Sequence, residues 1–87
     1  MSHTVHDKKK LLGRLRRIGG QVAALARVIE GEAECAEVLQ QIAAVRGAVN
    51  GLMLEVLEGH LREHALGHSS SKDETEQVIS IVRAYVR

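Results

Sequence analysis

The 87-residue chain contains no phenylalanine, tryptophan or proline, and Tyr85 is its only aromatic residue. Without proline, nothing forces a break in a long helix. The single cysteine, Cys35, excludes an internal disulfide. No apolar run approaches the roughly 18 residues that span a bilayer, and no signal-peptide pattern opens the chain. We therefore expect a helical, soluble, cytoplasmic protein without a membrane partner.

The charges are nearly balanced in total but unevenly distributed. Twelve Lys and Arg residues face 11 Asp and Glu residues, for a net charge of +1. Residues 1–27 contain seven basic side chains and one acidic, whereas residues 28–66 contain two basic and seven acidic. A basic segment joined to an acidic one suggests a surface that binds a polyanion. The alternative is an ordinary solvated basic helix face.

Hydrophobic residues recur at spacings of three and four, which is the period of an amphipathic helix and not of a strand. Helices are predicted over about 5–30, 34–66 and 72–86, in one all-α domain covering residues 1–87. The first two apolar stripes are Leu11, Leu15, Ile18, Val22, Leu25 and Ile29, and then Cys35, Val38, Ile42, Val45, Val49, Leu52 and Val56.

The second predicted helix is too long for so small a domain. At a rise of 1.5 Å per residue, its roughly 30 residues span about 45 Å. A helix that overhangs its own domain and is apolar over a broad face usually buries that face against another chain. The sequence therefore predicts an oligomer.

One cysteine and two histidines on the second predicted helix could share a metal only between chains. His60 and His64 are four residues apart, so they lie on one helix face. Cys35 is about 37 Å away along a straight helix. Pairing two copies antiparallel, with the two-fold axis near Gly47 and Gly51, brings Cys35 of one chain opposite both histidines of the other. The alternative for Cys35 is a small buried hydrophobe in the apolar stripe.

This donor set selects a class of metal. Thiolate and imidazole ligands suit nickel, cobalt, zinc and copper, whereas magnesium and calcium require oxygen ligands. Near the start of the chain, His3 adds an imidazole. If Met1 is removed, the amine of Ser2 stands beside it as a chelating partner. If Met1 stays, its own amine, one residue further from His3, can bind nickel or copper together with that imidazole.

Three sequence blocks carry a family resemblance: residues 1–8 (MSHTVHDK), 34–36 (ECA) and 38–53 (VLQQIAAVRGAVNGLM). With them, essentially the whole chain resembles the CsoR/RcnR/FrmR family of small all-helical bacterial repressors. The nickel/cobalt-responsive, RcnR-like branch is the most similar. Its sensing positions match His3, Cys35, His60 and His64, with the terminal amine contributing. The resemblance implies a tetramer, built as a dimer of antiparallel dimers, that represses a metal-efflux gene until Ni(II) or Co(II) binds.

The residues that distinguish the branches of this family leave a second function open for this chain. The formaldehyde-sensing branch typically has proline at position 2 and an acidic residue matching His64, where this chain has Ser2 and His64. Both branches share Cys35 and His60, so a formaldehyde-responsive repressor using Cys35 and the amino-terminal amine stays open. Copper and persulfide sensors use a second cysteine, which this chain lacks. Zn(II) and Cu(I) stay as secondary metal candidates.

Basic side chains on the first predicted helix point to double-stranded DNA as the polyanion. Lys10, Arg14 and Arg17 are spaced four and three apart, so they line one face. By the family resemblance, Arg14, Arg17 and Arg46 are the expected phosphate or groove contacts. A plain helical interaction module, with incidental Cys and His, is the alternative from another class. No nucleophile, carboxylate pair or phosphate loop indicates an enzyme.

Overall fold

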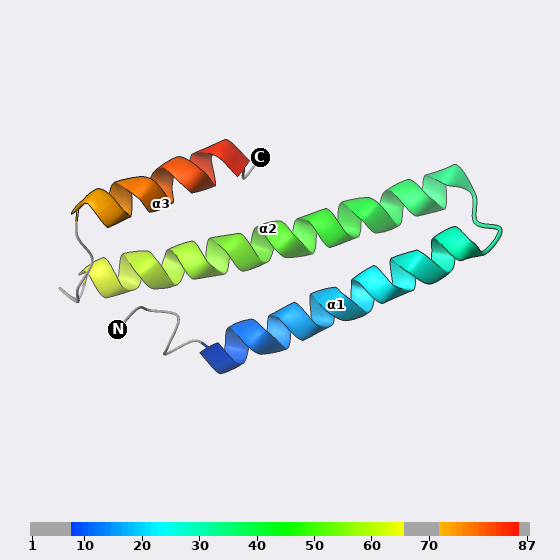
Figure 1. Ribbon diagram of the computed structural model, residues 1–87, viewed down its shortest axis with the longest axis horizontal. Helices are drawn as coiled ribbons and strands as arrows, with labels where there is room; N and C mark the ends of the chain where they lie inside the picture. Colours follow the sequence, from blue (N-terminus) through cyan, green and yellow to red (C-terminus); the bar gives the residue numbers. More distant parts are fainter. Residues whose placement is uncertain (1–7, 66–71, 86–87) are drawn as a thin grey trace.

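The computed structural model describes residues 8–65 and 72–85, which form three helices without a strand. Helix α1 covers Lys8–Glu30, α2 covers Cys35–Ala65 and α3 covers Lys72–Tyr85. Figure 1 shows α1 and α2 as an antiparallel hairpin, with α3 lying along the other side of α2. The predicted all-α fold of three helices is confirmed. No helix in the described part of the chain is long and apolar enough to cross a membrane.

The short connection after Glu30 reverses the chain direction. The N–H of Gly31 donates to the Arg27 carbonyl at 3.1 Å, which completes the last turn of α1. The carbonyl of Glu34 then accepts the first bonds of α2, from the N–H groups of Glu37 at 3.0 Å and Val38 at 3.1 Å. These bonds end one helix and begin the next within four residues, and the two helices run back along each other (Figure 1).

The protein is a flat layer with almost no interior. Its extents are 53 × 26 × 13 Å, and the shortest is close to the diameter of a single helix. The chain exposes 6594 Å², whereas a compact monomer of 9.5 kDa exposes about 5,000 Å². Among the hydrophobic side chains of the described residues, only Ile18 is buried. One chain therefore cannot close a core around its apolar residues.

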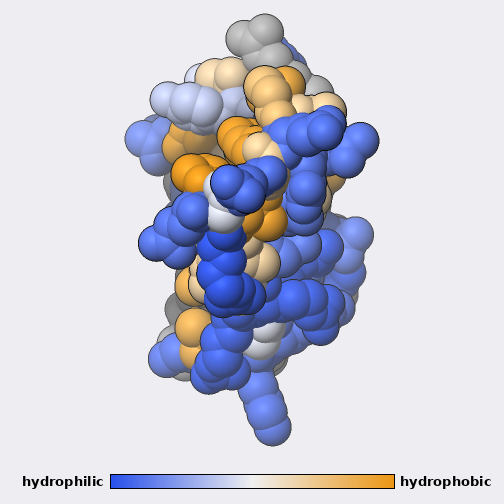
Figure 2. Space-filling model, turned by 90° about the vertical axis from the view of Figure 1, so that its right-hand side faces the viewer, coloured by the Kyte–Doolittle hydropathy of each residue, from blue (hydrophilic) through white to orange (hydrophobic). Residues whose placement is uncertain are grey.

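Many hydrophobic side chains lie open on this layer. Figure 2 views the molecule from the end at which α1 and α2 are connected, and hydrophobic side chains reach the surface among hydrophilic ones, mostly in the upper half. The large exposed hydrophobic residues are Leu12, Leu15, Val22, Ile29, Leu39, Ile42, Val49, Leu54, Leu61, Ile79, Ile81 and Tyr85.

The apolar stripe of α1 is covered on one edge only. Ile18 is buried against α2, and Arg14 and Gln21 are half-buried, whereas Leu15 and Val22 are exposed. Helix α2 is the neighbour of α1 within the chain (Figure 1), and the exposure of Leu15 and Val22 shows that it leaves one edge of the stripe uncovered. The other edge of the stripe stays available to a further chain.

Candidate metal centre and nucleic-acid interface

Cys35 and His60 share one face of α2. Cys35 is the first residue of the helix and is exposed. His60 follows 25 residues later, which is about seven full turns, so both side chains leave the helix in nearly the same direction. At a rise of 1.5 Å per residue they are about 37 Å apart. The two residues therefore share a face but cannot share an ion within one chain.

His60 is held by α3. Its side chain is 1% exposed, and its Nε2 lies 3.1 Å from the Thr75 hydroxyl oxygen, within hydrogen-bond distance. Its Nδ1 lies 3.8 Å from a carboxylate oxygen of Glu74. The sequence did not predict either contact, because the residues between α2 and α3 do not indicate which turns of the two helices lie opposite each other.

Several predicted metal ligands lie outside what the structure describes. Ser2 and His3 precede the described residues. His64 lies in the last turn of α2, but its side chain is outside the described set. Among residues 8–65 and 72–85 of one chain, no three His, Cys, Asp or Glu side chains gather as a metal site. The thiol of Cys35 and the imidazole of His60 are donor types that suit a transition metal.

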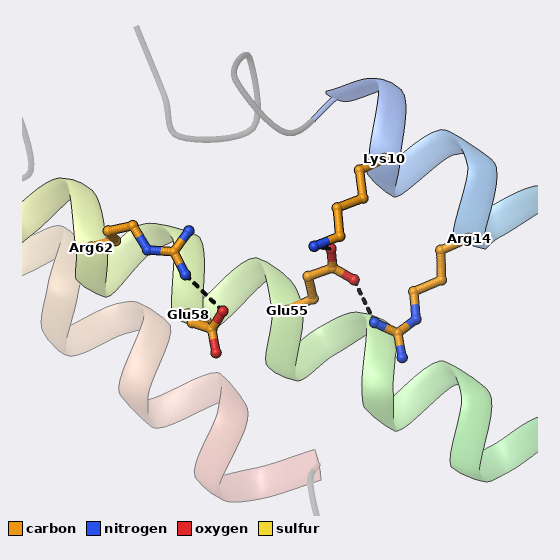
Figure 3. Close-up of polar contacts among 5 residues, drawn as sticks. All are labelled: Lys10, Arg14, Glu55, Glu58 and Arg62. Carbon is orange, nitrogen blue, oxygen red and sulfur yellow. Dashed lines mark hydrogen bonds and ion pairs between the residues drawn. The ribbon is translucent and has the colours of Figure 1, made fainter.

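Two predicted DNA-binding residues, Lys10 and Arg14, converge on Glu55 of α2 (Figure 3). Arg14 Nη1 donates a hydrogen bond to Glu55 Oε1, and Lys10 Nζ lies 3.4 Å from Glu55 Oε2. The Glu55 side chain is only 12% exposed, whereas Lys10 is 76% exposed and Arg14 is 41% exposed. The hydrogen bond from Arg14, with the help of Lys10, holds the pKa of the Glu55 carboxyl below its usual value.

Gly51 provides the space in which the Arg14 guanidinium lies. A Cβ at position 51 would stand 2.8 Å from Arg14 Nη2, whereas a Cβ at Gly47 would meet no atom of the described residues within 4 Å. The sequence placed the two-fold axis of an antiparallel pair of chains near both glycines. At Gly51 the neighbour is a side chain of the same molecule, and for Gly47 the approach of a second chain stays a prediction.

The hairpin register explains these contacts. Counting equal numbers of residues outward from Glu30 and from Cys35 brings Arg14 opposite Gly51, with Glu55 one turn beyond. Part of this signal is in the sequence, since the first predicted helix ends at about residue 30 and the second begins at about residue 34. The count gives the axial register but not the rotation of α1 against α2, so the sequence did not identify Glu55 as the partner of Lys10 and Arg14.

The other two predicted DNA contacts are exposed but separate. Arg17 is exposed on α1, and Arg46 is exposed on α2. Because Arg46 and Glu55 are nine residues apart, about two and a half turns, they point to opposite sides of α2. The structure therefore does not bring Arg46 next to Lys10 and Arg14 within one chain.

An apolar groove lies between α2 and α3, on the side of α2 that carries His60. Its volume is about 380 Å³. The residues that line it are Val49, Leu52, Met53, Val56, Leu57, Val78, Ile81 and Val82. Helix α3 therefore covers the second half of the Cys35–His60 face and leaves the first half, with Leu39 and Ile42, uncovered.

A basic first helix, a long second helix with one thiol and a buried imidazole, and an unfilled core are consistent with the small helical repressor that the sequence predicts. Comparison with known proteins agrees. Residues 7–84 match the protein family described as metal-sensitive transcriptional repressor. The transcriptional repressor RcnR of Citrobacter koseri is 49% identical over 90 residues, covering all of both chains. A Serratia marcescens protein described as uncharacterized, in the bioA 5′ region, is 54% identical over 91 residues and also matches in full.

A solved structure shows the same fold. It is a variant, with one glutamate replaced by histidine, of the formaldehyde-responsive regulator FrmR from Salmonella enterica serovar Typhimurium. It is 46% identical and superposes with a TM-score of 0.72 over 93% of this chain and 96% of that one.

The chain belongs to the family of metal-sensitive transcriptional repressors that includes RcnR and FrmR. It is a transcriptional regulator and not an enzyme, as the sequence predicted. The family resemblance is thereby confirmed, and a helical module without a regulatory role is disfavoured.

Proposed function

We propose that this repressor is released from operator DNA when Ni(II) or Co(II) binds between two antiparallel protomers, which derepresses a metal-efflux gene. The observation that carries the proposal is the position of Cys35 and His60 on one face of α2, about seven turns apart. Only a second chain running in the opposite direction can bring such residues together. The full-length similarity to RcnR supports the nickel or cobalt branch.

The uncovered half of this face supports the pairing. Leu39 and Ile42 lie near the Cys35 end of α2, and both are exposed in one chain. A stable monomer rarely leaves a helix face of this kind open, whereas an interface between copies buries it. Pairing about a two-fold axis creates the Cys35–His60 juxtaposition twice. Two such dimers form the tetramer that the family resemblance implies.

Five groups form the proposed metal site. Cys35 supplies a thiolate, the partner supplies His60 and His64, and the amino-terminal end supplies His3 and the amine of Ser2. When bound, the metal supplies a fixed junction between the chain start and two long helices. His60 must then exchange one of its contacts with α3, so binding of the metal and the position of α3 are coupled.

The proposed DNA face consists of Lys10, Arg14 and Arg17 on α1 and Arg46 on α2. Helix α1 begins with three consecutive lysines and carries no acidic residue in its first turn. Because His3 lies just before these lysines, anchoring it to a metal reorients the start of the basic helix. A coupling free energy of about 1–3 kcal/mol between metal and DNA is typical of such linkage.

The experiment that tests this function follows DNA release. Duplexes selected by the protein from a random pool are titrated with nickel, cobalt, zinc, Cu(I) and formaldehyde, with fluorescence anisotropy as the readout. We expect nickel or cobalt to release the wild-type protein from DNA and to leave Cys35→Ala bound. Release of Cys35→Ala at wild-type metal concentrations would refute the metal site.

The second candidate is the formaldehyde response, which the similarity to FrmR favours. In this reaction the amine adds to formaldehyde and loses water, and the Cys35 thiol then adds to the resulting imine. A methylene bridge therefore joins nitrogen and sulfur, with a net gain of one carbon. Mass spectrometry of the intact protein after exposure to formaldehyde detects that gain, and its absence in Cys35→Ala identifies the site.

A further inference from the structure

The Glu55 carboxylate already pairs with Lys10 and Arg14, two of the cationic side chains that the proposed function assigns to DNA binding. The Glu55 carboxylate comes from α2, and Lys10 and Arg14 come from α1, so the contact joins the two helices of the hairpin (Figure 3). Both oxygens take part, Oε1 with Arg14 and Oε2 with Lys10. Gly51 leaves room for the guanidinium to lie against α2.

The exposure of the three side chains shows which of them can change partners. Glu55 is almost covered, whereas much of Lys10 and Arg14 stays open to solvent. A DNA phosphate offers the same kind of anionic oxygen as a carboxylate. A guanidinium or ammonium group that approaches phosphate must therefore weaken its contact with Glu55 or leave it. Each carboxylate charge left in the contact region also cancels one cation that would otherwise displace counterions from DNA.

We propose that Glu55 weakens DNA binding by competing with backbone phosphates for Lys10 and Arg14. The inference rests on the proposed DNA-binding function and adds an internal competitor to it. Glu55 lies on the helix that also carries His60, five residues before it. The competitor is therefore built into the element that holds a proposed metal ligand.

The test compares Glu55→Gln with the matched variant Glu58→Gln. Glu58 lies on the same helix, is exposed, and pairs with Arg62 at 2.8 Å rather than with α1. Both variants remove one negative charge, but only the first frees Lys10 and Arg14. The full-length protein, without metal, is titrated into a labelled mixed-sequence DNA duplex over a series of salt concentrations. A mixed sequence suffices because phosphate contacts are independent of sequence.

We expect Glu55→Gln to bind DNA about threefold to tenfold more tightly than Glu58→Gln at low salt. Its plot of log affinity against log salt should be steeper by about 0.9 for each protomer in contact with DNA. Glutamine retains an acceptor for Arg14, so the helical circular dichroism signal should be kept. Affinity equal to or lower than that of Glu58→Gln overturns the inference, because Glu55 would then be neutral or would position Arg14 for DNA.

A second comparison does not depend on how Glu55→Gln folds. Lys10→Gln removes a cation that Glu55 partly neutralises, whereas Arg17→Gln removes an exposed cation that Glu55 does not hold. We expect Arg17→Gln to reduce the salt slope more than Lys10→Gln, and the reverse order counts against the inference. If the wild type does not bind the duplex at all, the proposed function itself is refuted. If the wild type binds but the affinities or salt slopes of the variants rank in the reverse order, only the proposed role of Glu55 is refuted.

Discussion

Replacing Leu39 by serine tests whether the open face of α2 is the surface on which two chains meet. Leu39 is 59% exposed in one chain and lies one turn beyond Cys35. Full burial of a leucine side chain contributes about 1.5–3 kcal/mol, so covering the exposed part contributes about 1–2 kcal/mol. A two-fold interface uses the residue twice, which gives about 2–4 kcal/mol per dimer. The dimer dissociation constant should therefore rise about 30-fold to several hundredfold.

Sedimentation equilibrium over a dilution series measures this change, and Ile29→Ser is the matched control. Ile29 is 58% exposed, but it lies at the end of α1 rather than on the Cys35 face. We expect Leu39→Ser to yield monomers at concentrations where Ile29→Ser still sediments as a dimer or larger. If Ile29→Ser yields monomers and Leu39→Ser does not, α1 and not the Cys35 face of α2 forms the dimer, and the proposed metal site cannot assemble.

Two further predictions concern the hairpin itself. Because Arg14 lowers the folded-state pKa of Glu55, the stabilisation from that contact is present above the usual carboxyl pKa and is lost as the pH falls through the lowered value. Between about pH 6 and pH 3, the free energy of unfolding measured in urea should fall more steeply for the wild type than for Glu55→Gln. If the free energies of the two proteins fall in parallel, the contact between Glu55 and Arg14 is excluded. Gly20→Ala, at a glycine of α1 where a Cβ would meet no atom of the described residues within 4 Å, should stabilise its helix by up to about 1 kcal/mol, whereas Gly51→Ala should gain less because its methyl group displaces Arg14. Equal melting temperatures for the two alanine variants would contradict that arrangement.

The three helices follow from local sequence alone. The spacing of apolar residues reports the helical period directly, and the absence of proline allows α2 to run for 31 residues. Gly31 marked the end of α1 because a helix commonly ends at glycine. The shared face of Cys35 and His60 also follows from counting residues, since helical position is a function of residue number alone.

The contacts between helices could not be read in the same way. The sequence placed Lys10 and Arg14 on a basic face, but their attachment to Glu55 depends on how α1 rotates against α2. The cover that Thr75 and Glu74 form over His60 depends in the same way on where α3 lies, which helical period does not specify.

The sequence by itself determined three helices, a basic beginning, and a thiol and an imidazole on one face of the second helix. Only the tertiary structure decided that an acidic residue holds two of the basic ones, that an arginine fills the space over Gly51, and that α3 covers His60. The physical reason is that the period of a helix is fixed by bonds between neighbours in the chain. The mutual rotation of two helices is instead fixed by side chains that lie far apart in sequence.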